Sequence, residues 1–545
     1  TMASALRIVN VTDVYKLDNF SHLRTLIKEK RKEAEEKYPG SKTVSILTGD
    51  FLAPYLLSSV DKGIGMMKML NGTPIDYVIF GNHEDDLEHE YVCKRCKEFN
   101  GTWINTNMQD HEQMEDQVPF DIVELTNKDG KNNKKVGFIG VLSDSLSLYR
   151  KNFFNGATIK DPYDTMEEYK KLLETEHGVD LVIPLCHLYV PQDKVTCERF
   201  DFPVVLSGHD HHVVDEVYNG TRLLKAGADA ENAVILDIIF DEDGKLSIDA
   251  EVIKVTDFEP DAELKEAFER AMSVLTKLEH TEITKVPAKY RPLNSANARS
   301  QDSSVAHFLF AKLKEALNSR DESVPTVDAV FISGGNIRGG KIYDVDRKKF
   351  SLKDLKDELQ ESLEAVIVSV PGDVIVKGVK ATHGESNPGY MQFDGDVVLD
   401  KDGNVAEIAG EPIDLKKKYR IATTLWDIED GPSYPLTNYF KENPEELPTS
   451  EFPIMATLLS HFAKFVWKQV WKSLDTNNDG VIDEEELKAI DTDGDGKISK
   501  AELGAMMKKL GWDVDESEYG FVDCIFEVAG DKNKDGYLSA DELNV

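Results

Sequence analysis

Six short apolar segments in the first 255 residues alternate with longer polar stretches, and this alternation restricts the fold more than any other feature. Short apolar runs bounded by polar, helix-forming stretches are typical of strands buried in an α/β sheet. We therefore predict an α/β domain over residues 1–255, with βαβ units packed around a largely buried sheet. The predicted strands are Leu6–Asn10, Val44–Leu47, Tyr77–Phe80, Val136–Val141, Leu181–Leu185 and Val204–Leu206.

Metal-ligating residue types follow five of these six segments directly. Because the carboxyl ends of such strands converge, we expect these side chains to gather at one edge of the sheet, where open α/β folds place their sites. Two divalent ions close together need a bridging carboxylate, several imidazoles and an open face for water and substrate. The residues that could supply this set are Asp13, Asp50, Asn82, His83, His187, His209, Asp210 and His211.

Three short motifs resemble those of a known enzyme family. Gly49-Asp50, Gly81-Asn82-His83-Glu84 and Gly208-His209-Asp210-His211 are similar, in order and spacing, to the GD, GNH(E/D) and GHxH motifs of calcineurin-like metallophosphoesterases. The resemblance implies a β-sandwich flanked by helices and two transition-metal ions, either divalent or mixed-valence, drawn from zinc, manganese and iron. It also implies that Asp50 bridges the ions, that Asp13 and His211 hold the first, and that Asn82, His187 and His209 hold the second.

The resemblance leaves His83 for catalysis. Asp86 matches the aspartate that pairs with this histidine in the 5'-nucleotidase branch of the family, where it fixes the tautomer and raises the basicity of the ring. By this analogy a metal-bound hydroxide would attack phosphorus in line. His83 would stabilise a phosphoryl oxygen or protonate the departing alcohol.

Tyr15 departs from the family pattern. The first motif of the family is Asp-x-His, whereas this chain has Asp13-Val14-Tyr15. A neutral phenol is a poor ligand for zinc, but a phenolate suits a hard trivalent ion, and the distantly related purple acid phosphatases hold iron(III) with a tyrosine on a different loop. Three interpretations stay open: Tyr15 packs beside a weakly held first metal, it ligates iron, or the first site is empty and activity is lost.

The middle of the chain resembles the substrate domain of 5'-nucleotidases. We predict a connecting segment over residues 256–285, with an amphipathic helix, and a smaller α/β domain over 286–450. Ser333-Gly334-Gly335-Asn336-Ile337-Arg338 is similar to Asn-x-Gly-Gly-Ile-Arg of that family, and Arg299-Ser-Gln-Asp302 to its Arg-x-x-Glu. Trp426 falls where the family has one of two stacking rings, and Tyr390 or Phe393 could replace the other. The substrate-binding residues that the resemblance implies are Arg299, Asn336, Arg338 and Trp426.

Three segments after residue 455 have the pattern of a calcium-binding EF-hand loop, with oxygen ligands at positions 1, 3, 5, 7, 9 and 12 and glycine at position 6. We predict an all-α domain over 455–545 that binds Ca²⁺. The second and third loops start 40 residues apart and should pair, whereas the first starts only 16 residues before the second and should be irregular or unpaired. The predicted ligands are Asp475, Asn477, Asp479, Val481, Asp483, Glu486, Asp491, Asp493, Asp495, Lys497, Ser499, Glu502, Asp531, Asn533, Asp535, Tyr537, Ser539 and Glu542.

Composition excludes some function classes. The formal net charge of −36 argues against binding to nucleic-acid phosphates and suits a chain that collects divalent cations. No apolar run reaches the roughly 18 residues of a membrane span, so we expect no integral membrane association. We expect a cytoplasmic protein if the chain begins at its native start, and a secreted or cell-surface protein if a leader was removed. We interpret Cys93-x-x-Cys96 as structural, and we expect His22, His89, His111 and His177 at the surface.

The leading interpretation is therefore a two-metal hydrolase that acts on small-molecule phosphomonoesters. The resemblance implies that its substrates are 5'-nucleotides. Calcium would regulate or stabilise the protein. Two alternatives stay open. One is a phosphodiesterase acting on cyclic nucleotides or other diesters, and the other is a catalytically impaired calcium sensor or scaffold.

Overall fold

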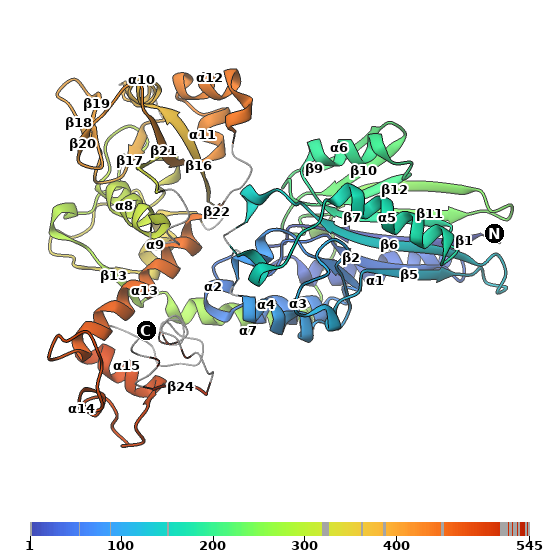
Figure 1. Cartoon of the computed structure of the whole chain (residues 1–545), viewed down its shortest axis with the longest axis horizontal. Helices are drawn as coiled ribbons and strands as arrows, with labels where there is room; N and C mark the ends of the chain where they lie inside the picture. Colours follow the sequence, from blue (N-terminus) through green and yellow to red (C-terminus); the bar gives the residue numbers. More distant parts are fainter. Residues whose placement is uncertain are drawn as a thin grey trace. The chain divides into compact units, whose positions relative to one another are not determined.

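The structure is a computed structural model that describes residues 3–512 except 54, 88, 150–151, 319–325, 361–362, 385–388 and 448–451, together with residues 522, 526, 531, 535–539 and 542. The chain forms two compact units, Thr1–Met272 and Ser273–Val545 (Figure 1). The predicted substrate domain and EF-hand tail both fall within the second unit. The finer predicted borders near residues 255, 285 and 450 stay predictions.

The first unit contains two mixed six-stranded sheets. In the first sheet, β1 to β4 run parallel, β11 is antiparallel to β1, and β12 is antiparallel to β11. In the second, β6, β7, β8 and β10 run parallel, with β5 and β9 antiparallel at the two edges. The first sheet has the order β12 (Leu246–Lys254), β11 (Asn232–Phe240), β1 (Ser4–Val11), β2 (Lys42–Leu47), β3 (Tyr77–Ile79), β4 (Thr102–Ile104). The second has the order β5 (Phe120–Leu125), β6 (Lys134–Leu142), β7 (Leu181–His187), β8 (Val204–Ser207), β10 (Thr221–Ala226), β9 (Val213–Tyr218).

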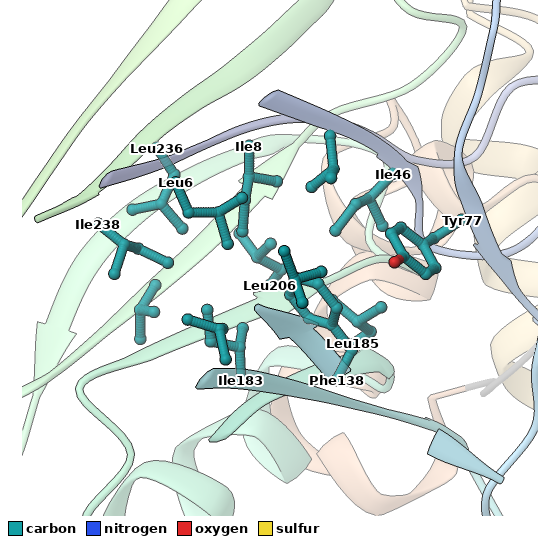
Figure 2. Close-up of a cluster of buried hydrophobic side chains, with 14 of the residues drawn as sticks. Leu6, Ile8, Ile46, Tyr77, Phe138, Ile183, Leu185, Leu206, Leu236 and Ile238 are labelled. Carbon is teal, nitrogen blue, oxygen red and sulfur yellow. The ribbon is translucent and has the colours of Figure 1, made fainter. Parts of the chain in front are cut away.

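The core of this unit lies between the two sheets. Because side chains alternate along a strand, Leu6 and Ile8 of β1 face inward, where they lie opposite Phe138, Ile183 and Leu206 of the second sheet (Figure 2). The six predicted strands are confirmed, and the two packed sheets confirm the expected α/β sandwich class. Most of the strands that the predictions missed are short or lie at the sheet edges, whereas β11 was missed although it is long and apolar.

Helices cover the outer faces of both sheets, which explains why the central strands are apolar on both sides. Helix α1 packs on β1 and β2, and α5 and α6 supply Leu173 and Cys197 to a second buried cluster on the outer face of the other sheet. The helices of this unit are α1 (Phe20–Lys37), α2 (Ser58–Asp61), α3 (Ile64–Gly72), α4 (His89–Glu98), α5 (Pro162–Thr175) and α6 (Val190–Arg199), and α7 (Ala262–Leu278) carries the chain into the second unit.

The second unit is built on a five-stranded sheet in the order β17 (Met391–Phe393), β14 (Ala329–Ser333), β21 (Lys418–Thr423), β16 (Glu364–Pro371), β22 (Phe452–Pro453). Smaller sheets are formed by β13 (Glu282–Lys285) with β15 (Lys349–Ser351), and by β18 (Val398–Leu399), β19 (Val405–Ile408) and β20 (Glu411–Pro412). Its helices are α8 (Ser304–Asn318), α9 (Leu352–Glu358), α10 (Gly372–Thr382), α11 (Leu425–Glu429) and α12 (Tyr434–Glu442).

The EF-hand region continues from this sheet through α13 (Ile454–Leu474), which packs against α8 and β13. It contains α14 (Glu484–Leu487) and α15 (Lys500–Lys509), and β23 (Ile498–Ser499) pairs with β24 (Tyr537–Leu538). This pairing confirms that the second and third loops form a pair. Among the described residues, none of the helices combines the length and the apolar character that crossing a bilayer requires.

Candidate metal centre

The predicted metal ligands of the first unit lie where strands of both sheets end. Asp13, Asp50 and Asn82 follow β1, β2 and β3, His187 is the last residue of β7, and His209 and His211 follow β8. Within each sheet these strands run parallel, so their carboxyl ends share an edge.

Three of these side chains form a compact group. The ligand atoms of Asp50, His187 and His209 all lie within 4.8 Å of one another. His187 Nε2 is 3.0 Å from Asp50 Oδ2, and Asn82 Oδ1 is 2.8 Å from His209 Nδ1. The structure thus brings together all four residues that the resemblance assigned to the second metal.

Tyr15 lies in the middle of the other predicted set. Its phenol oxygen is 3.1 Å from Asp50 Oδ2, 3.0 Å from His211 Nε2 and 3.5 Å from Asp13 Oδ1. His211 Nε2 is itself 3.6 Å from Asp13 Oδ1. The phenol oxygen therefore lies among the groups that would surround a first ion. A Tyr15 that ligated this ion would need to lie there.

His83 is held in one orientation by Asp86. The ring is 7% exposed, and its Nδ1 lies 2.6 Å from Asp86 Oδ2. The backbone N–H of His83 donates to Asp50 Oδ1 at 2.8 Å, which ties the histidine to the residue between the two ligand sets.

The backbone at these strand ends is unusual. Asp13, Asp50 and His209 have φ values of 52°, 57° and 81°, in the left-handed region that non-glycine residues rarely adopt. Two glycines of the same motifs, before Asn82 and before His209, are required by contact: a Cβ on Gly81 would lie 2.1 Å from Asp50 Oδ1, and one on Gly208 would lie 2.2 Å from Thr12 Oγ1. The motif glycines therefore let the ligand-bearing loops approach one another closely.

Glu84 holds two of these loops together. Its buried carboxylate accepts hydrogen bonds from the backbone N–H groups of Asp50, Phe51, Leu52 and Gly81 at 2.6–3.1 Å. Burial raises the pKa of Glu84 to about 7, and Asp50 adds to the rise while the backbone donors oppose it. Sequence reasoning assigned Glu84 no role, because a side chain that binds only backbone groups has no partner residue to reveal it.

Lys225 is a second site residue that the sequence did not reveal. It is completely buried, and its ammonium donates to the carbonyl oxygens of Leu188 and Gly208 at 2.7 Å each. It also pairs with Asp193 at 2.7 Å and with Asp210. These contacts join the loop that follows β7, whose last residue is His187, to the loop after β8, which carries His209 and His211.

The electrostatics of the group favour a cation. Burial raises the pKa of Asp13, whereas in Asp50 the effect of burial is outweighed by His187 and the other imidazoles, which lower its pKa. Burial alone would lower the pKa of His187, but Asp50 and Asp13 raise it to about 9. A histidine that retains its proton beside two buried carboxylates marks a place where positive charge is stabilised.

The donor set fits transition-metal ions. Carboxylate oxygens, imidazole nitrogens and amide oxygens are ligands for zinc, manganese and iron. His187 Nδ1 donates to the carbonyl oxygen of Thr48 at 2.8 Å, which fixes the ring and turns Nε2 toward Asp50. Among the described residues, this buried Nε2 has no partner with hydrogen-bond geometry. It is positioned as a ligand atom.

The predicted substrate-binding residues lie around the carboxyl ends of β14 and β21, which run parallel. Asn336 follows β14 and donates to the Ser333 hydroxyl at 3.1 Å, and Arg299 and Arg338 are exposed. Trp426 on α11 is 53% exposed, as a stacking ring must be. Of the two candidates for a second ring, Phe393 is buried in the core and Tyr390 is stacked on His383 at 3.7 Å, so Phe393 was a wrong suggestion.

The three EF-hand loops have similar local geometry. Gly480, Gly496 and Gly536, at position 6, have φ values of 81–82°. In the second loop Asp491, Asp493 and Glu502 bring carboxylate oxygens within 4.8 Å of one another. In each loop the glutamate at position 12 accepts the N–H of the residue at position 9, at 2.9–3.2 Å. The predicted ligand Asn533 lies outside the described residues.

The four histidines expected at the surface differ in exposure, since His177 is exposed, His22 and His89 are partly buried, and His111 is buried. His111 is only 2% exposed and its ring packs against Phe80 and Phe154, while His89 is partly buried against Cys93. The prediction failed because the loop that carries His111 has no periodic apolar pattern. The burial of His111 comes from contacts with residues that are distant in sequence.

The comparisons agree with this geometry. Residues 6–213 match the family of calcineurin-like phosphoesterases, and residues 472–490, 487–507 and 528–545 match the EF hand. The trifunctional nucleotide phosphoesterase protein YfkN of Bacillus subtilis is 21% identical over 486 residues, which are 78% of this chain and 32% of that protein. This chain thus spans about a third of the length of the curated relative that it matches.

Two solved structures show the same fold. The NAD nucleotidase of Haemophilus influenzae is 15% identical with a TM-score of 0.62, over 86% of this chain and 97% of that one. A putative 5'-nucleotidase of Staphylococcus aureus is 16% identical with a TM-score of 0.53, over 84% and 96% of the two chains. The first unit therefore carries a calcineurin-like phosphoesterase domain, the chain has structural similarity to two-domain 5'-nucleotidases, and its C-terminal region carries EF-hand motifs.

Proposed function

We propose that this chain hydrolyses phosphomonoesters at a two-metal site, with 5'-nucleotides as its substrates. The observation that carries the proposal is the assembly of Asp50, His187 and His209 within 4.8 Å, beside Asn82 and the paired His83 and Asp86. The proposed ligands are Asp13, Tyr15, Asp50, Asn82, His187, His209 and His211. Metal ions bound there would supply positive charge for the phosphoryl oxygens and lower the pKa of an attacking water.

The residues of the chain have distinct proposed roles. Asp50 lies between both ligand sets and is placed to bridge them, since one oxygen faces Tyr15 and His187 and the other accepts the His83 N–H. Because Asp86 accepts from His83 Nδ1, the Nε2 atom of His83 is the one that would donate to a phosphoryl oxygen or to the departing alcohol.

Nucleotides are the proposed substrate class for two reasons. Relatives with this fold include proteins named for nucleotide hydrolysis. The second unit also presents an exposed tryptophan, Trp426, and two exposed arginines, Arg299 and Arg338, which suit a nucleobase and anionic groups respectively. Replacing Trp426 by alanine should raise KM for a nucleoside monophosphate and leave KM for a small aryl phosphate unchanged.

The test is a hydrolysis screen of the full-length chain. Phosphomonoesters and diesters are assayed with zinc, manganese and iron, before and after chelation. Activity should require metal and favour monoesters, and His83→Ala should lower kcat for a poor leaving group by roughly 10²–10⁴-fold. His177→Gln, which changes an exposed histidine, is the control.

Three outcomes of the screen would oppose the proposal. A preference for diesters would support the phosphodiesterase alternative. Activity that His83→Ala leaves unchanged would remove its catalytic role, and no hydrolysis with any metal would support the calcium sensor or scaffold.

We propose further that the EF-hand loops bind calcium through the ligands predicted from the sequence. The left-handed glycines and the converging carboxylates of Asp491, Asp493 and Glu502 support this assignment.

A further inference from the structure

A second cluster of metal-ligating side chains joins helix α4 to the loop after β4. His89 and Cys93 are four residues apart on α4 and therefore share a face of the helix, while His111 and Glu112 come from the loop. The ligand atoms of His89, Cys93 and His111 all lie within 4.8 Å of one another. None of these residues belongs to the candidate metal centre described above.

The distances within the cluster are close to those of a tetrahedral site. Cys93 Sγ lies 3.3 Å from His89 Nε2 and 3.1 Å from Glu112 Oε1, and the last two atoms are 3.1 Å apart. Ligand atoms bound to one zinc at about 2.0–2.3 Å would be separated by roughly 3.3–3.6 Å. A slight opening of this triangle would accommodate an ion.

His111 supplies an independent observation. It is 2% exposed, and its Nδ1 accepts from the Gln113 N–H at 3.3 Å and from the Gln117 amide at 3.2 Å. The ring proton therefore lies on Nε2, which is buried and has no hydrogen-bond partner among the described residues. An orphaned nitrogen of this kind is costly unless it binds something else. Coordination through Nε2 would move the proton to Nδ1, which would give up the Gln113 N–H, and the Gln117 amide would turn to accept the proton and release its bond from Asn105.

We propose that His89, Cys93 and His111, with Glu112 in the fourth position, bind one zinc ion as a structural site. A thiolate and two imidazoles favour zinc over calcium or magnesium, and four protein ligands form a closed site with no position for substrate. The site would connect the loop to α4, which begins three residues after Asp86, and His111 packs on Phe80, which precedes the Gly81-Asn82-His83 turn. Zinc here would stiffen the segment that carries the proposed catalytic histidine.

Cobalt(II) is the probe for the experiment, because a bound thiolate gives a charge-transfer band in the near ultraviolet. The residues proposed for the catalytic centre and the EF-hand loops include no cysteine, so the band reports only this cluster. The full-length, metal-depleted chain is titrated with cobalt in excess calcium. We expect a band that saturates at one cobalt ion and that zinc removes by competition.

Variants identify the ligands. Cys93→Ser should abolish the band, whereas Cys96→Ser, on the same helix and bonded through sulfur to Gln117, should keep it. His89→Gln and His111→Gln should keep a weaker band and lower cobalt affinity by roughly tenfold or more. Circular dichroism checks that each variant is folded, and His89→Gln, at a partly exposed position, serves if Cys93→Ser does not fold.

The proposal is overturned if the parent chain shows no thiolate band, if the band persists in Cys93→Ser, or if Cys96→Ser loses it as completely as Cys93→Ser does. It is also overturned if neither histidine variant weakens binding.

Discussion

Tyr15 is the residue whose chemistry most affects the candidate centre. Its oxygen lies within 3.5 Å of Asp13, Asp50 and His211, where the family motif has a histidine. As a neutral phenol it would donate to the carboxylates and hold the first ion weakly, while as a phenolate it would bind a trivalent ion firmly. Which ion occupies the first position therefore depends on this side chain.

Substitution of Tyr15 should distinguish a neutral phenol from a phenolate ligand. Tyr15→His restores the family motif and should raise the affinity of the first position for zinc or manganese, whereas Tyr15→Phe should lower it. Metal content after dialysis measures the effect. A visible band in the parent that Tyr15→Phe abolishes would identify an iron phenolate, and unchanged metal content in both variants would show that Tyr15 is not a ligand.

At the residue scale, the sequence predicted the polar side chains that stand at strand ends and missed those that bind the backbone. Asp13, Asp50, His187 and His209 were recognisable because they follow apolar strands in a family order. Glu84 and Lys225 were not, because their partners are N–H and carbonyl groups or carboxylates that only the fold brings near. His111 was misjudged for the same reason: its burial comes from packing on Phe80.

At the scale of elements, the loops after β7 and β8 depend on one buried cation. Replacing Lys225 by methionine removes the ammonium and leaves Asp193 and Asp210 facing each other without it. We expect a loss of about 3–5 kcal/mol in the free energy of unfolding and a lower metal content, because His187 directly precedes the first loop and His209 lies in the second. Denaturant unfolding and metal analysis measure both.

Lys245→Met, at an exposed position, is the control for this change. A Lys225→Met protein with the stability and metal content of the parent would show that the buried triad has no positioning role.

A second prediction concerns the contact between α8 and α13. Glu315 lies 3.4 Å from His461 and 2.7 Å from Lys312. Partial burial would raise the pKa of Glu315, but His461 and Lys312 lower it to about 2 from the ordinary 4.5. The folded state therefore binds this proton less readily than the unfolded state, so the stabilisation is complete above pH 4.5 and is lost as pH falls toward 2.

Glu315→Gln should accordingly lower the melting temperature of the second unit near pH 6, and the difference from the parent should shrink as the pH falls from 4.5 toward 2. The effect should be small, since the side chain is half exposed. Glu411→Gln, an exposed carboxylate of β20, is the control, and a Glu315→Gln difference that did not change with pH would refute the assignment.

The helices and strands themselves were largely predictable where the apolar pattern was strong. The six predicted strands, α7 and the pairing of the second and third calcium loops are present. The division into two packed sheets was visible only through the family resemblance, because β11 and β12 return from distant sequence to join β1. Strand pairing over such separations leaves no local signal.

At the scale of the whole molecule, calcium should stabilise the second unit. In each of the three loops the aspartate at position 1 accepts the N–H of the glycine at position 6, which folds the loop into a turn. Each ion bound only by the folded state adds about 2.7 kcal/mol at a hundredfold excess over its Kd. We expect the melting temperature of the second unit to rise with calcium and to rise less in Glu502→Gln. A melting temperature that is insensitive to calcium would contradict calcium binding by these loops.

The central claim is that a two-metal site at the strand ends of the first unit hydrolyses phosphate esters. The most direct test measures kcat/KM for a phosphomonoester together with bound metal in the full-length chain and in Asp50→Asn, which replaces the proposed bridge with a side chain of the same size. We expect Asp50→Asn to remain folded, to lose metal and to lose at least roughly 10²-fold in kcat/KM. Full activity and full metal content in that variant would contradict the account.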